Sequence, residues 1–107
     1  MMKVHTLAPL WATATLIACA SGGAVPRVTE PDVARAQLAD PDVSLASLER
    51  GRGLYLARCA SCHEPFAPDS RSLDEWHLEV DEMRERSGLD PAEERLILGY
   101  LSTFSRP

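Results

Sequence analysis

The sequence is poor in lysine, in aromatic residues and in long apolar runs, and each shortage excludes a class of protein. Its only lysine is Lys3, and sixteen acidic residues against eleven basic ones give a net charge of −5. Binding to nucleic acid, or to anionic lipid through a polybasic patch, requires a basic surface and is not expected. No apolar run approaches the roughly 20 residues of a transmembrane helix. Two Trp, two Tyr and two Phe in 107 residues leave little bulk for a large core.

The N-terminus is typical of an export signal. Lys3 and His5 form a short polar start, and an apolar run of twelve residues follows, from Leu7 to Ala18. That length suits the apolar region of a signal peptide, residues 1–18, and is too short to span a bilayer. An amphipathic or buried helix is the alternative.

Two cleavage sites compete at the end of this run. The stretch Leu-Ile-Ala-Cys that ends at Cys19 resembles the bacterial lipobox, in which the cysteine is lipidated and becomes the new N-terminus. Ala-Cys-Ala also fits ordinary signal peptidase, which would remove Cys19. We favour lipidation, because the lipobox match is complete and the residues that follow it are small and flexible. Lipidation would also give a use to Cys19, the odd one of three cysteines. Ala20 resembles the pattern of lipoproteins sent to a Gram-negative outer membrane, where a triacylated cysteine anchors stably.

Residues 19–46 are expected to be the lipidated cysteine and a flexible linker. A Ser-Gly-Gly-Ala stretch is flexible. Three prolines are expected to break any long helix in it: Pro26, Pro31 and Pro41. A brief helical turn over 33–39 is compatible with the sequence, but no side chain there demands a core. The linker is therefore expected to hold an ordered domain, residues 47–107, away from a membrane.

The ordered domain is predicted to be all-α, with three helices and no alternating strand pattern. The first helix covers roughly 48–62. The second begins after Ser72, with Glu75 completing a capping box, and ends near Gly88. The third begins at Asp90, which is followed by a proline that suits the first turn. Roughly sixty residues with few large apolar side chains make a marginal core, so a covalently bound group is expected to fill the centre.

Cys59, Cys62 and His63 form a Cys-x-x-Cys-His motif, which is the attachment signature of haem c. Residues three and four apart share a face of a helix, so all three side chains can point at one macrocycle. The two thiols would form thioethers, and His63 would be the proximal iron ligand. Haem attachment takes place after export, so a signal peptide is an expected companion. A zinc site and a thiol–disulfide redox site are the less favoured alternatives.

Beyond the motif, the chain resembles the cytochrome c family from about residue 47 to residue 104. Gly51, Tyr55 and Cys59 match the family's glycine–aromatic–cysteine spacing in the first helix. The resemblance implies that Gly51 lets the first and last helices cross closely, against Tyr100 in the last helix. It also implies that a proline carbonyl orients the proximal histidine, that of Pro65 or Pro68.

Met83 and His77 are the candidates for the distal iron ligand. Trp76, Val80 and Met83 share one face of the second predicted helix, whereas His77 points about 100° away from Trp76. The stripe of Trp, Val and Met resembles short cytochrome c domains that carry a distal methionine. We therefore expect Met83 to bind the iron. The alternatives are His77, an open or water-bound site, and a Met83 that only fills the core.

The expected function is one-electron transfer by a single covalent haem c in the bacterial envelope, without enzymatic turnover. Thioether ligation opposite an imidazole predicts a fairly positive reduction potential. The expected partners are redox proteins of the envelope and, through Cys19, a membrane on its periplasmic side, with the outer membrane favoured over a soluble periplasmic form. The alternatives are an open-site haem protein that binds a gas or peroxide, and a haem subunit of an oxidoreductase complex.

Overall fold

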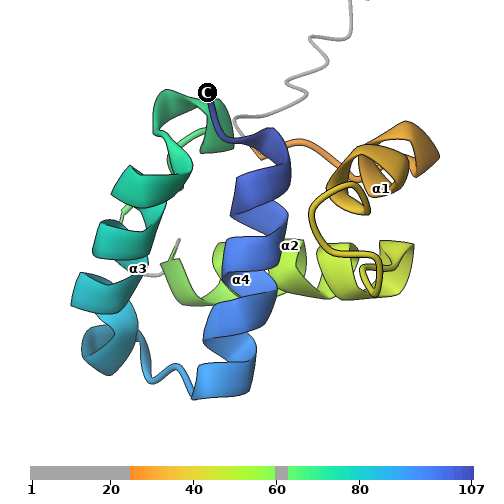
Figure 1. The fold of residues 1–107 in the computed structure, drawn as a ribbon. Coiled ribbons are helices and arrows are strands. Elements are labelled where there is room, and N and C mark those ends of the chain that lie inside the picture. The colour runs from red at the N-terminus through yellow and green to blue at the C-terminus, as the bar shows by residue number, and fades with distance from the viewer. Residues whose placement is uncertain (1–24, 60–62) are drawn as a thin grey trace, which may run out of the picture.

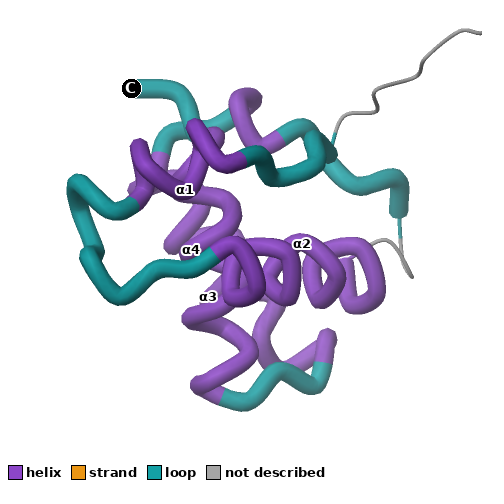
Figure 2. The backbone as a smooth tube through the Cα atoms, turned by 90° about the vertical axis from the view of Figure 1, so that its right-hand side faces the viewer, coloured by secondary structure: helices purple, strands orange, loops and turns teal. Residues whose placement is uncertain are grey.

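The computed structural model describes residues 25–59 and 63–107. They form four α-helices and one 3-10 turn: α1 (Glu30–Ala36), α2 (Leu45–Cys59), η1 (Pro68–Ser70), α3 (Leu73–Ser87) and α4 (Pro91–Phe104). No strand occurs within these two ranges, and one isolated parallel bridge joins Ser72 to Arg106 (Figure 2). The described residues are therefore mostly helical, which is compatible with the predicted all-α class. None of the described helices is both long and apolar enough to cross a bilayer.

Helices α3 and α4 begin and end where their capping residues predict. The Ser72 hydroxyl accepts the N–H of Glu75, and the Glu75 carboxylate accepts the N–H of Ser72. Gly88 follows the last residue of α3 in the left-handed conformation, with φ of 64°. Asp90 and Glu93 form the same reciprocal pair at the start of α4. Each cap satisfies N–H groups that the helix itself leaves unpaired, so these boundaries follow from local sequence.

Helix α2 begins three residues before its predicted start. The N–H of Ser44 donates to Ser47 Oγ at 3.0 Å, and the N–H of Ser47 donates to Ser44 Oγ at 3.1 Å. Two serines thus play the parts that serine and glutamate share in an ordinary capping box. The described part of the helix ends at Cys59, so the predicted continuation to Cys62 lies outside the described residues.

Helix α4 packs against both α2 and α3. Figure 1 shows α3 and α4 beside each other, with α2 crossing behind α4. The two helices approach closely at Gly51, where an added Cβ would lie 2.0 Å from the Leu96 carbonyl oxygen and 3.0 Å from Tyr100 Cβ. The predicted close approach of the two helices at Gly51, against Tyr100, is confirmed.

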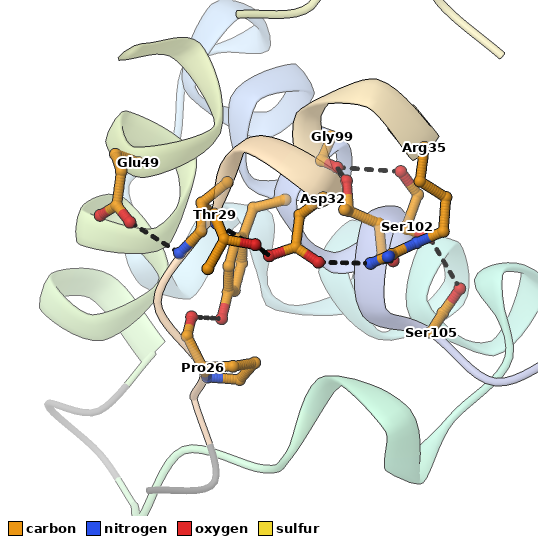
Figure 3. Close-up of polar contacts among 11 residues, drawn as sticks. Pro26, Thr29, Asp32, Arg35, Glu49, Gly99, Ser102 and Ser105 are labelled. Atoms are coloured by element: carbon orange, nitrogen blue, oxygen red, sulfur yellow. Dashed lines mark hydrogen bonds and ion pairs between the residues drawn. The ribbon is translucent and has the colours of Figure 1, made fainter. Parts of the chain in front are cut away.

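Residues 25–44 pack against these helices and do not form the predicted linker. Three of their side chains are buried in the core: Val25, Val28 and Val33. The Tyr100 hydroxyl donates to the Pro26 carbonyl at 2.7 Å, and Glu49 Oε1 accepts the N–H of Val28 at 2.8 Å (Figure 3). This part of the chain therefore belongs to the ordered domain, and the prediction of a flexible linker is wrong for it.

Helix α1 explains why the prolines misled the sequence prediction. The N–H and hydroxyl of Thr29 both donate to Asp32 Oδ2, at 2.8 and 2.6 Å, which fixes the first turn. Pro31 lies within that turn. A proline breaks a helix in its interior, but in the first turn its missing N–H has no partner to lose. Pro31 therefore stands near the start of a helix and does not prevent one.

Candidate functional site

Helices α2 and α3 face each other across a pocket, with few points of close approach between their described residues. The cavity volume of the pocket is about 30 Å³. The lining residues come from α2, from the segment that follows it and from α3: Tyr55, Cys59, His63, Phe66, Trp76, Glu79, Val80 and Met83. Three of the four predicted haem residues therefore share one pocket. Cys62, and Cys19 with the signal sequence, lie outside the described residues.

The His63 ring has its two nitrogens in different surroundings. Its Nδ1 lies 2.8 Å from the carbonyl oxygen of Glu64. A carbonyl oxygen only accepts hydrogen bonds, so Nδ1 carries the proton in this contact, and in the neutral ring the lone pair is then at Nε2. This tautomer is the one that binds a metal through Nε2. The carbonyl beside Nδ1 is that of Glu64, whereas the resemblance implied that of Pro65 or Pro68.

Two aromatic residues form the buried wall of the pocket. Trp76 donates its indole N–H to the Pro68 carbonyl at 2.7 Å, which fastens η1 to α3. Tyr55 meets Trp76 edge to face, with ring centroids 5.9 Å apart, and donates its hydroxyl to the Phe66 carbonyl at 2.7 Å. Burial raises the pKa of Tyr55 to about 12. The phenol therefore keeps its proton, and remains a hydrogen-bond donor, at neutral pH.

On the α3 side, the structure separates the two candidate distal ligands. Met83 is half-buried and lines the pocket together with Trp76 and Val80, as their shared helix face predicted. His77 is exposed and is not part of the lining. The fold therefore brings Met83, and not His77, to the pocket that His63 lines. A thioether sulfur accepts hydrogen bonds only weakly, so the Met83 side chain can serve as a ligand without giving up a hydrogen bond.

Arg71 contacts three of the residues that line the pocket and was not predicted from the sequence. Its guanidinium lies 4.3 Å from the Phe66 ring centroid and 5.0 Å from that of Trp76, and 3.6 Å from the Glu79 carboxylate. Cation–π contacts of this kind are typical of arginine. Arg71 and Phe66 lie in the segment between α2 and α3, which has no helical periodicity. The sequence therefore gives no sign that they meet. The contacts depend on tertiary structure and leave no sequence signal.

The chemistry of the lining fits a haem. The imidazole of His63 and the thiol of Cys59 come from the motif, the thioether of Met83 comes from α3, and aromatic and aliphatic side chains surround them. The cavity itself, at about 30 Å³, is far smaller than the usual small-molecule site of about 300–1,000 Å³, so the side chains that line it would have to move apart to admit a macrocycle. Within residues 25–59 and 63–107, no group of three or more His, Cys, Asp or Glu side chains is arranged to hold a metal ion.

Comparisons with protein-family models, with curated proteins and with solved structures found no match to this chain. The all-α fold and the geometry of the pocket are therefore observations on this chain alone. The resemblance to the cytochrome c family depends on the motif and spacings of the sequence.

Proposed function

We propose that this protein is a small exported electron carrier that holds one covalent haem c. The observation that supports the proposal most strongly is that Met83, from α3, lines one largely apolar pocket together with Cys59 and His63 of the motif, twenty or more residues earlier in the chain. Cys62, three residues after Cys59, would supply the second thioether. The bound iron would supply a one-electron couple between its ferrous and ferric states.

The roles of the chain's own residues follow from their surroundings. His63 would bind through Nε2, because its Nδ1–H is directed at the Glu64 carbonyl. Met83 would bind from α3, and a thioether favours the ferrous state more than a second imidazole would. Trp76 and Val80 are buried and keep water from that wall of the pocket. An apolar wall disfavours the additional charge of the oxidised state, so both effects raise the reduction potential.

The spectrum of the oxidised protein tests this assignment. A methionine–iron charge-transfer band in the near infrared, with a reversible one-electron titration and little immediate response to cyanide, is the expected result. A high-spin spectrum that shifts at once when cyanide or nitric oxide is added would contradict it. That result would favour the alternative of an open-site haem protein. Co-purification with other redox subunits from detergent extracts would instead favour a subunit of an oxidoreductase complex.

We also propose that lipidation at Cys19 holds the protein on the periplasmic side of a bacterial membrane, with the outer membrane favoured. Val25 is already buried in the ordered domain, so only residues 20–24 lie between it and Cys19. Six Cα–Cα steps span about 22 Å at most, whatever their conformation. The domain would therefore work close to the lipid surface, and its redox partners in the envelope would have to reach it there.

A further inference from the structure

The segment 64–66 is held at both ends beside the candidate proximal ligand. At one end, the Glu64 carbonyl oxygen lies 2.8 Å from His63 Nδ1. At the other end, the Phe66 carbonyl accepts the Tyr55 hydroxyl at 2.7 Å. The segment therefore connects the imidazole to α2, the helix that also carries Cys59 of the proposed haem attachment.

Tyr55 is a fixed donor. Its side chain is 2% exposed, and its ring lies 5.9 Å from Trp76 and 6.4 Å from Tyr100 between centroids. It lies four residues before Cys59, and residues four apart share a face of a helix. Because packing leaves the ring little freedom, its hydroxyl fixes the distance between the Phe66 carbonyl and α2.

We propose that Tyr55 is a positioning residue for the proximal ligand: its hydroxyl holds segment 64–66 so that the Glu64 carbonyl keeps the hydrogen bond to His63. This inference rests on the proposed function. A carbonyl that accepts the second N–H of a ligating imidazole fixes the ring orientation and makes the imidazole a stronger donor to the metal. A stronger donor stabilises the oxidised metal. Loss of the Tyr55 hydroxyl therefore weakens this effect and raises the reduction potential.

The test compares Tyr55→Phe with Tyr100→Phe in the haem-loaded protein. The two tyrosines are matched, because Tyr100 is also buried and also donates to a backbone carbonyl at 2.7 Å, that of Pro26. Tyr100 is not part of the pocket lining. Both variants are expected to lose thermal stability to a similar degree. Only Tyr55→Phe is expected to raise the reduction potential and to move the hyperfine-shifted haem resonances in the NMR spectrum of the oxidised protein.

Each outcome decides a different point. Potentials that are equal in wild type and Tyr55→Phe, or moved equally by Tyr100→Phe, overturn the positioning role and leave the proposed function standing. A wild-type protein without covalent haem overturns the proposed function and this inference with it. If Tyr55→Phe does not retain haem, the test is the rate at which the Tyr55 hydroxyl and His63 Nδ1 protons of the reduced wild-type protein exchange with solvent. Slow exchange of both protons supports the inference. Exchange as fast as in an exposed side chain overturns it.

Discussion

The close crossing of α2 and α4 makes Gly51 the position at which one added methyl group should do the most damage. In Gly51→Ala, the new Cβ would lie 2.0 Å from the backbone oxygen of Leu96. Ordinary contact needs roughly 3.5 Å, so the helices would have to separate by roughly 1.5 Å. A backbone oxygen cannot rotate away as a flexible side chain can.

The magnitude is a difference between a gain and a cost. Alanine stabilises a helix interior by about 1 kcal/mol relative to glycine. Forcing a methyl group into a packed crossing costs about 3 kcal/mol at the upper end of the usual range. The separation would also loosen Ile97 and Tyr100, which are fully buried on α4. We expect a net loss of about 2 kcal/mol, which lowers the melting temperature of a domain of this size by about 10 °C.

Gly53→Ala is the matched control for this measurement. Gly53 lies two residues further along α2, is exposed, and would place its Cβ with no atom within 4 Å. Helix propensity alone should then act and raise the melting temperature by about 5 °C. Thermal unfolding followed by circular dichroism gives both values. A Gly51→Ala protein as stable as the wild type, or more stable, would refute the close crossing.

Three further predictions concern the site, the acid stability and the anchor. Met83→Ala should remove the near-infrared band of the oxidised protein and admit cyanide, while His77→Ala should leave the spectrum as it was; the reverse pattern would exclude Met83 as a ligand. Hydrogen bonding, chiefly from the backbone N–H of Ser72, lowers the pKa of Glu75 from 4.5 to about 2. This carboxylate therefore contributes its full stabilisation of the folded state above about pH 4.5 and loses it as the pH falls toward 2. In Glu75→Gln, the melting temperature should fall less steeply between these two pH values. Cys19→Ser should release the exported protein from the membrane fraction, and membrane retention after this change would contradict lipidation.

The helix boundaries that could be predicted are those that local hydrogen bonds determine. The reciprocal caps at Ser72 and Asp90 involve residues three apart, so the sequence contains all of the interacting partners. The end of α3 could be predicted for a similar reason, because it depends on a single residue, Gly88, which adopts the left-handed conformation. The pattern at Thr29 and Asp32 was equally visible, but the neighbouring proline favoured an interpretation as linker.

The contacts that escaped prediction join segments far apart in the chain. Tyr100 and Pro26 are separated by 74 residues, and no periodicity indicates that one will bond to the other. The burial of Val28 likewise depends on where α2 and α4 lie, and not on its neighbours in sequence. At the site, the motif and the helix face predicted that Cys59, His63 and Met83 lie together, but they did not predict that Phe66 and Glu79 line the same pocket. The contact between the His63 ring and the Glu64 carbonyl depends on the backbone conformation of these two adjacent residues, which no pattern in the sequence indicates.

The mass of the exported chain tests the central claim most directly. The protein should be produced with the haem-attachment machinery, denatured, and measured by mass spectrometry together with its pyridine haemochrome spectrum. We predict a polypeptide that still carries the mass of one haem after denaturation, because two thioethers at Cys59 and Cys62 are covalent, and a double Cys→Ser variant that does not. A folded, helical wild-type chain of unmodified mass, or a haem that dissociates on denaturation, would contradict the account.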